Sequence, residues 1–414
     1  MANDFKNTSL VTRYAVKEFL NALVMGAKVD RQLDDSKVFS GKVGASVSIR
    51  RPVYFEATDG ATISSTPDVE EAIVPFTLDQ RKKVNFTVSA QDLTLKIEDA
   101  NERYIKPAMQ ELAQKVESSI AGAYTEIPNF VGTPGTGPST FLHVGACKAA
   151  MTRLGAPHTD LYGFWSADAA LAIADGLKGV YVQGSAKNAL QEAAVGRYGG
   201  LDNFESNSLA SHTVGTWGTS TILIDDAGTT STTYAASKDT NTQVINLDGF
   251  ASSSTAACLK AGDVITIAGV NSVNRKTRED TGNLQTFVVT ADTGASTGTT
   301  DNITATVSPP IIISGPYQTV TAAPADDAAV TVLTGASGTT HLQNMTFHKN
   351  AITLACVPLD VITDGANGAR ENFGGISIKT QRQYDFDSDS LKYRFDILYG
   401  VKVQNGSMAC RRTS

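Results

Sequence analysis

Carboxylate side chains gather in one short stretch near the C-terminal end of the sequence. Asp385, Asp387 and Asp389 stand at alternate positions, as the first oxygen ligands of a calcium-binding loop do. The pattern is incomplete, because Ser390 stands where that loop needs a glycine and Asp396 would replace the glutamate that binds calcium through both oxygens. We therefore favour a solvated turn between two strands, with a calcium site as the alternative.

Other motifs that could do chemistry are weak. Gly132–Pro138 is a glycine-rich loop, but no Gly-Lys-Ser/Thr follows it, and Pro138 lacks the N–H that a phosphate cradle uses. The five histidines form neither an HExxH nor an HxH group, and no serine lies in a Gly-x-Ser-x-Gly elbow. We therefore expect no catalytic residue, no cofactor and no metal, and hence not an enzyme.

Four cysteines are spread along the chain without a CxxC pair: Cys147, Cys258, Cys356 and Cys410. That spacing matches neither a zinc site nor a small disulfide framework. We interpret them as buried thiols in a reducing compartment. No apolar stretch approaches the ~20 residues of a membrane span, and the first ten residues show no export signal. We expect a protein that is neither exported nor inserted in a membrane.

The composition is that of a globular protein of two to four domains, with 414 residues, 41% hydrophobic and 19% charged. The net charge is −7, and no run of Lys and Arg is longer than the three residues Arg81–Lys83. Affinity for DNA grows with the number of phosphates that basic side chains neutralise, so tight direct DNA binding is disfavoured.

Charged residues form small clusters, several of mixed sign. A solvated face is the ordinary interpretation of such a cluster. The alternative is pairing between subunits, where mixed-sign clusters give register and specificity more than affinity. The candidate inter-subunit contacts are Arg50, Arg51, Glu56, Asp59, Arg81, Lys82, Lys83, Arg275, Lys276, Arg278, Glu279 and Asp280.

Helical periodicity marks two segments of the N-terminal third. Apolar residues recur at helical spacing over Tyr14–Ala27 and over Lys106–Tyr124. Pro107 fits best in the first turn of the second helix, because a proline inside a helix costs about 3 kcal/mol. Between the helices, Val43–Ile49 and Lys83–Val88 alternate as strands do. We predict a long two-stranded ribbon, which needs a partner surface to lie on.

The segment before residue 221 reads as mixed α/β, and three strands are predicted after residue 340. The expected helices are Leu142–Leu154, Ala167–Gly176 and Ala186–Ala194, around a strand at Leu161–Trp165. The return strands are Asn350–Pro358, Gly375–Tyr384 and Leu391–Gln404.

Residues 221–340 differ in composition from the rest. They contain 25 threonines and carry −6 of the net charge of −7. Short β-branched runs broken by Gly, Asp, Asn and Ser predict a small antiparallel barrel or sandwich, inserted into the first domain. The expected strands are Thr221–Ile224, Gln243–Leu247, Val264–Ala268, Leu284–Thr290, Ile303–Val307, Tyr317–Thr321 and Val330–Leu333.

Several stretches resemble the major coat proteins of tailed bacteriophages, in particular the short-tailed Salmonella-phage coat family that carries an inserted domain. The most specific matches are Leu259–Asn271 with its continuation to Thr290, Tyr317–Thr321, Phe347–Ala355 and Arg394–Gly400. Weaker matches are Arg31–Asp35 and Glu102–Met109.

The resemblance implies an α+β fold of the Hong Kong 97 capsid type with an inserted all-β domain, and a major capsid protein that self-assembles into an icosahedral shell around the phage genome. The implied parts are an N-terminal arm (1–35), an extended loop (36–90), a spine helix with the first part of the peripheral and axial domains (91–220), the insertion (221–340) and the return strands (341–414).

The resemblance also implies the partners and the location. The partners are other copies in hexamers and pentamers, a scaffolding protein, a portal, a decoration protein as a further candidate, and packaged DNA held weakly and non-specifically. The location is the virion capsid, after synthesis in the bacterial cytoplasm. Two other classes stay open: a surface-displayed adhesin-like β-domain protein, and a carbohydrate-active enzyme with an accessory β-domain, which would need a carboxylate pair in a cleft.

Overall fold

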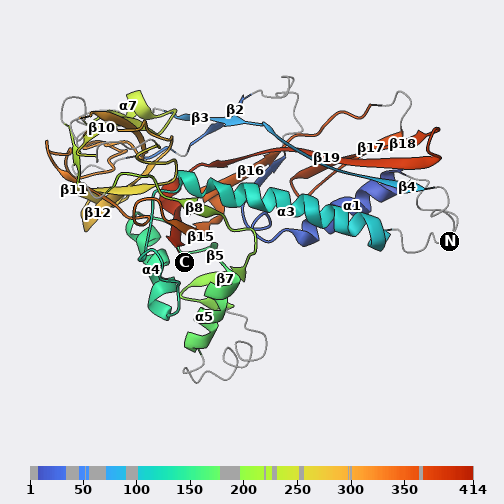
Figure 1. Ribbon diagram of the computed structural model, residues 1–414, viewed down its shortest axis with the longest axis horizontal. Coiled ribbons are helices and arrows are strands. Elements are labelled where there is room, and N and C mark those ends of the chain that lie inside the picture. The colour runs from blue at the N-terminus through green and yellow to red at the C-terminus, as the bar shows by residue number, and fades with distance from the viewer. Residues whose placement is uncertain are drawn as a thin grey trace, which may run out of the picture. The chain divides into compact units, whose positions relative to one another are not determined.

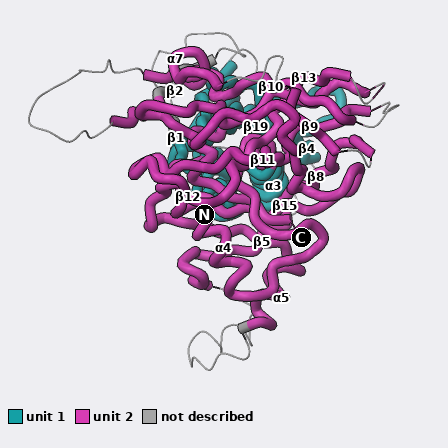
Figure 2. The backbone as a smooth tube through the Cα atoms, turned by 90° about the vertical axis from the view of Figure 1, so that its left-hand side faces the viewer, with its two compact units in different colours: residues 1–48, 76–121, 352–402 teal, residues 49–75, 122–351, 403–414 magenta. Residues whose placement is uncertain are grey.

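The computed structural model describes residues 8–33, 46–51, 53–55, 71–89, 101–177, 196–218, 221–225, 231–250, 256–296, 298, 301–362 and 367–413. The chain divides into two compact units, shown in different colours in Figure 2. Unit 1 comprises residues 1–48, 76–121 and 352–402, and unit 2 comprises residues 49–75, 122–351 and 403–414. Among the described residues, no helix is long and apolar enough to cross a membrane.

Unit 1 is built on a sheet with strand order β1-β16-β19-β18-β17, to which β4 adds by pairing with β19 (Figure 1). Gly374 and Gly375 join β17 to β18 as a two-residue hairpin loop, and their φ angles of 60° and 81° are those that a type I′ turn requires. The strands are β1 (Asp30–Leu33), β4 (Gln80–Ser89), β16 (Ile352–Cys356), β17 (Asn367–Phe373), β18 (Ile376–Asp385) and β19 (Ser390–Val403).

Two helices complete unit 1. Helix α1 (Thr8–Ala22) packs on β17 and β18, and helix α3 (Lys106–Gly122) follows a π-helical turn at Asn101–Ile105. Pro107 is the second residue of α3 and so lies in its first turn, as predicted. The apolar stripe of α3 is buried at helical spacing: Met109, Leu112, Val116 and Ile120.

Helix α1 ends five residues before the end of its apolar pattern. The backbone N–H groups of Val24, Met25 and Gly26 donate to the carboxylate of Glu117 on α3, at 2.8–3.0 Å. A helix cannot continue through residues whose N–H groups are bound elsewhere. A contact that is distant in sequence therefore overrides the local periodicity.

The predicted two-stranded ribbon is wrong in its pairing. Strand β2 (Ser46–Arg50) pairs with β3 (Ile73–Thr77), whereas β4 pairs with β19 along its whole length. The aromatic ring of Phe86 explains the preference, because it stacks on Tyr393 and Phe395 of β19 with ring centroids 5.4 and 6.0 Å apart. Residues 34–45, where the predicted strand Val43–Ile49 begins, and residues 56–70 lie outside the described residues.

Unit 2 contains a closed β-barrel with strand order β10-β13-β12-β11-β14-β9. Its apolar core includes Ile245, Leu247, Ile265, Phe287 and Val307, each fully buried. The barrel confirms the predicted fold class with an all-β insertion. Its strands are β9 (Ile222–Ile224), β10 (Gln243–Asp248), β11 (Val264–Val273), β12 (Asp280–Val289), β13 (Ile303–Ser308) and β14 (Ala329–Val332).

The strand predicted at Tyr317–Thr321 does not form. A single bridge joins Val320 to Ser272, and the ring of Tyr317 stacks instead on Tyr234 of the short helix α7 (Tyr234–Ser237), with centroids 3.5 Å apart. The β-branched run is therefore used for packing rather than for a ladder.

A second sheet of unit 2 has strand order β20-β15-β5-β7-β6, with β8 also paired to β15. Apolar residues of the helices α4 (Phe141–Arg153) and α5 (Ala167–Leu177) form one buried cluster with residues of β5, β7 and β20. The predicted helix Ala186–Ala194 lies outside the described residues. The strands are β5 (Leu161–Trp165), β6 (Arg197–Tyr198), β7 (Leu201–Glu205), β8 (Ser211–Thr213), β15 (Thr340–His348) and β20 (Ala409–Thr413).

Three short 3-10 helices complete the described secondary structure: Ala123–Glu126, Lys349–Ala351 and Gly406–Met408. The first continues directly from α3, so the predicted helical pattern to Tyr124 is extended by a tighter final turn.

Candidate inter-subunit contact residues

Three of the candidate contacts stand next to one another on β4. Because side chains alternate along a strand, Arg81 and Lys83 share one exposed face, and Lys82 lies half-buried on the other. Arg81 contacts Asp396 of β19, with 3.5 Å between Nη2 and Oδ1. In the described part of the chain, no ion pair engages Lys82 or Lys83, so these two remain the better candidates for contacts with another subunit.

Asp396 explains why Arg81 differs from its neighbours. The Asp396 side chain is fully buried, and Arg394 donates to its two oxygens through Nε and Nη2, at 2.8 and 2.9 Å. Such a two-point hydrogen bond between guanidinium and carboxylate offsets the cost of burying the charge. Arg81 adds a second cation to this pair and so serves the folding of unit 1.

Arg51, like Arg81, contacts another residue of its own chain. Its side chain is half-buried, and Nη1 donates to the Lys238 carbonyl at 3.3 Å. Burial lowers the pKa of the Arg51 guanidinium. Arg50 belongs to β2, but its side chain lies outside the described residues, as do Glu56 and Asp59.

The other five candidates lie in or beside the turn between β11 and β12. Asn274 shapes this turn, because its carbonyl accepts from the Arg278 N–H at 2.7 Å and its side-chain oxygen accepts from the Lys276 N–H at 2.9 Å. Arg278 takes a left-handed φ of 61° there. Lys276, Glu279 and Asp280 are exposed, and Arg275 is half-buried. The turn thus brings charges of both signs together on the surface of unit 2.

Asp280 has its own fixed position in the turn. Its carboxylate accepts from Asn271 Nδ2 at 2.9 Å and from the Gly282 N–H at 2.8 Å. The hydrogen bond from Asn271 lowers the pKa of Asp280 below its ordinary value. A negative charge is therefore held at this exposed site over the physiological pH range.

The acidic turn after β18 is also engaged by protein groups. Asp385 contacts Lys392 and accepts from the Ser388 hydroxyl at 2.9 Å, and Asp389 accepts from the Tyr384 hydroxyl at 2.7 Å. Among the described residues, no three His, Cys, Asp or Glu side chains are close enough to hold a metal ion. These contacts are those of a turn between two strands.

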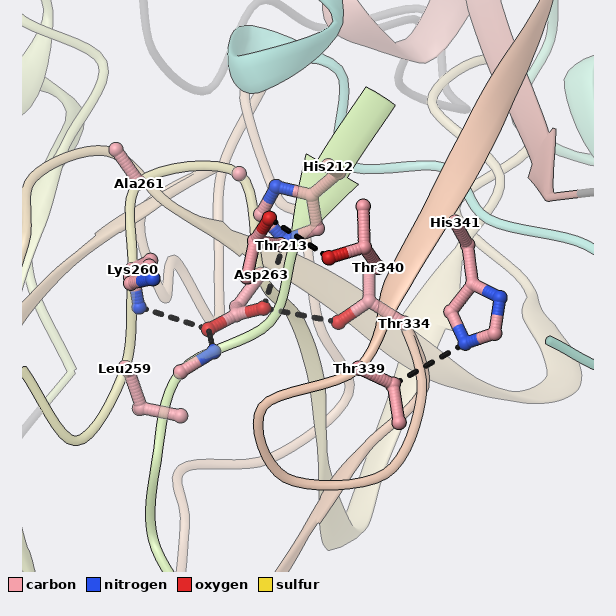
Figure 3. A network of polar contacts seen from close by, with 12 residues as sticks. His212, Thr213, Leu259, Lys260, Ala261, Asp263, Thr334, Thr339, Thr340 and His341 are labelled. Atoms are coloured by element: carbon pink, nitrogen blue, oxygen red, sulfur yellow. Dashed lines mark hydrogen bonds and ion pairs between the residues drawn. The ribbon is translucent and has the colours of Figure 1, made fainter. Parts of the chain in front are cut away.

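A buried polar network in unit 2 has no counterpart among the sequence motifs (Figure 3). His212 of β8 contacts Asp263 through Nε2 at 2.8 Å and the Tyr124 hydroxyl through Nδ1 at 3.1 Å. Asp263 precedes β11, and its carboxylate also accepts from the Lys260 N–H at 2.7 Å and the Thr334 hydroxyl at 3.1 Å. The one local signal is the Gly-Asp pair before a strand, which is typical of a turn.

The Tyr-His-Asp order of this network resembles an acid–base relay, but the side chains are sealed from solvent. His212 is 2% exposed and Asp263 is 0% exposed. Arg411 closes the site, because its guanidinium carbon lies 5.5 Å from the centre of the Tyr124 ring and its Nη2 donates to the Gly262 carbonyl. Burial lowers the pKa of Arg411 to about 10. The network therefore stabilises the barrel where β11 begins, and its buried side chains offer no access for a substrate.

Comparison with known proteins identifies the family. The model of the family described as P22 coat protein, gene protein 5, matches residues 1–411. No curated protein matches the chain. Among solved structures, the CUS-3 coat protein I-domain is 32% identical, with 28% of this chain and 98% of that chain covered and a TM-score of 0.20.

Two whole-chain structural matches are more distant. The structure titled Mycobacterium phage Che8 is 14% identical, with coverage of 94% of this chain and 90% of that chain and a TM-score of 0.45. The capsid structure of the cyanophage P-SCSP1u is 12% identical, with coverage of 94% and 88% and a TM-score of 0.45. The α+β fold of the Hong Kong 97 type with an inserted barrel agrees with the family match. The chain therefore belongs to the P22 coat protein family and is a major capsid protein, the subunit of the icosahedral shell of a tailed bacteriophage.

Proposed function

We propose that copies of this chain assemble as hexamers and pentamers, helped by a scaffolding protein and begun at a portal, in the cytoplasm of a bacterial host. The match of the coat protein family over residues 1–411 carries the proposal. We also propose a purely structural role without enzymatic activity, which is supported by the burial of the His212–Asp263 pair away from any substrate. Packaged DNA is held weakly, consistent with a net charge of −7.

Residues 221–340 act in this proposal as an insertion that contacts neighbouring capsomers. The exposed turn at residues 275–280 supports that role, because it presents both signs of charge at the end of a barrel hairpin. Mixed-sign charges set register between neighbours more than they set affinity. We also propose residues 221 and 340 as the boundaries of this insertion.

Assembly is tested by expressing the chain with and without its scaffolding protein. Sedimentation and negative-stain electron microscopy should show closed shells with scaffolding protein, and aberrant shells or polyheads without it. A chain that sediments as a folded monomer under both conditions would contradict the proposal. An assay on cell-wall polysaccharides serves as the control for the carbohydrate-active alternative, and we expect no turnover.

A further inference from the structure

Two short pieces of the chain, one before and one after residues 56–70, make hydrogen bonds with the inserted domain. These pieces, which we call the stem, are the described residues of 51–55 and 71–73. The Tyr54 N–H donates to the Tyr317 hydroxyl at 3.2 Å, and the Ile73 N–H donates to Asp239 Oδ1 at 3.1 Å. Both sides of the stem are therefore held by the insertion.

Two arginines add contacts between the stem and the insertion. Arg278 Nη2 donates to the Phe55 carbonyl and Arg51 Nη1 donates to the Lys238 carbonyl, each at 3.3 Å. The strands β2 and β3, which lead into the stem, form a sheet of only two strands, and such a sheet is marginal alone. Contacts on both strands resist twisting as well as bending, so the insertion supplies the support that the ladder lacks.

Tyr317 itself is held firmly on the barrel side. Its ring stacks on Tyr234 of α7, with centroids 3.5 Å apart and an angle of 1° between the planes, and it meets the Tyr54 ring edge-on at 5.7 Å. Four residues later, the Thr321 N–H donates to the Asn271 carbonyl of β11 at 3.0 Å. The run that was predicted as a strand therefore anchors Tyr317 to the barrel, where its hydroxyl reaches the stem.

We propose that the insertion positions the stem for assembly, with Tyr317 and Asp239 as the positioning residues. Tyr317 is half-buried and Asp239 is exposed, so neither side chain belongs to the apolar core of the barrel. Their loss should free the stem while the barrel stays folded. The role in assembly rests on the proposed function, because a symmetric shell repeats one contact geometry and each copy must present its stem in the same direction.

The hydrogen bonds are tested on the unassembled full-length chain by hydrogen–deuterium exchange resolved to single amides. Tyr317→Phe keeps the ring that stacks on Tyr234 but removes the acceptor of the Tyr54 N–H, and Asp239→Ala removes the acceptor of the Ile73 N–H. We expect exchange of the affected amide to rise about fivefold in each variant, as loss of one hydrogen bond predicts. The melting temperature should change by less than about 2 °C.

Asp292→Ala is the matched control. Asp292 is also an exposed aspartate of the insertion that accepts one backbone N–H, from Ala261 at 2.8 Å. Its loss should leave the exchange of the Tyr54 and Ile73 amides at the parent rate. Unchanged exchange of both stem amides in Tyr317→Phe and Asp239→Ala would overturn the proposal, whether or not the chain assembles.

The role in assembly is tested with the double variant Tyr317→Phe/Asp239→Ala and scaffolding protein. We expect the yield of closed shells to fall below about half of the parent yield, with aberrant shells in their place. Asp239→Asn keeps a side-chain oxygen as acceptor and should assemble as the parent does. Closed shells at parent yield from a double variant with faster stem exchange would overturn the positioning role. A parent chain that forms no shells would contradict the proposed function instead, so the two failures are distinguishable.

Discussion

Glu117 is the residue that most clearly joins distant parts of unit 1. Its two carboxylate oxygens accept three backbone N–H groups of the segment that follows α1, so that segment is held against α3. Backbone donors that are buried without an acceptor cost about 1–3 kcal/mol each, more than an exposed ion pair contributes.

We expect Glu117→Ala to lower the free energy of unfolding of the unassembled chain by about 3 kcal/mol, because three donors lose their acceptor. Urea unfolding followed by circular dichroism measures the effect. Glu111→Ala on the same helix is the matched control, since Glu111 is exposed and its carboxylate forms an exposed ion pair with Lys115 at 3.6 Å. Its loss should stay below about 0.5 kcal/mol. Equal losses for the two variants would contradict this role of Glu117.

The same carboxyl group predicts a pH dependence. Burial raises the pKa of Glu117 although the three N–H groups oppose it. An acid with a raised pKa in the folded state binds its proton more tightly there, so this stabilisation is present below about pH 4.3 and is lost as the pH rises through the folded-state pKa. Glu117→Gln, which cannot ionise, should remove this component. Parallel stability curves for the parent and variant between pH 4 and 7 would be the contrary result.

At the scale of elements, the barrel and strand β8 depend on one another. Strand β8 pairs with β15 through Thr213 and Thr340, and its His212 contacts Asp263 beside β11. A buried aspartate that loses its partners is costly. The barrel strands supply the apolar core. The residues before 221 supply hydrogen-bond partners for the buried carboxylate of Asp263.

We expect the isolated fragment 221–340 to fold cooperatively, because its six barrel strands enclose their own apolar core. The longer fragment 211–342 should melt at least about 5 °C higher, since it restores His212 and the Gly215 N–H, which donates to Asp263 at 3.0 Å. Amide dispersion in NMR spectra and thermal unfolding give the measurement. A shorter fragment without a cooperative transition would show that the boundary at residue 221 is wrong.

At the scale of the whole molecule, symmetry multiplies small surface effects. An exposed ion pair contributes about 0–1 kcal/mol, but a shell repeats each interface many times. Arg81 and Lys82 allow this effect to be separated from folding, because they lie on opposite faces of β4: Arg81 is ion-paired with Asp396, whereas Lys82 stands opposite Ile397 in the ladder.

We expect Lys82→Glu to leave the urea midpoint of the unassembled chain nearly unchanged while it lowers the yield or the denaturant resistance of shells. Arg81→Glu should lower both, because it places a second negative charge beside buried Asp396. Monomer unfolding and shell sedimentation are compared for the two variants. Parent-like shells from Lys82→Glu would remove Lys82 from the candidate contacts.

The sequence by itself determined the elements whose pattern is local. The stripe of α3 and the position of Pro107 follow from helical spacing, and the barrel strands follow from short β-branched runs between turn residues. Resemblance to coat proteins then identified the fold that these elements form. Charge clusters were visible too, but their use as inter-subunit contacts stays a prediction.

Only the tertiary structure decided which distant residues meet. Glu117 ends α1 from 91–93 residues away, and β4 pairs with β19 rather than with β2. Such pairings depend on packing between elements, and neither helical nor strand periodicity carries information about the partner. The same reason explains the buried His212–Asp263 contact. Neither residue stands out in the sequence, but once both are buried, each needs a hydrogen-bond partner.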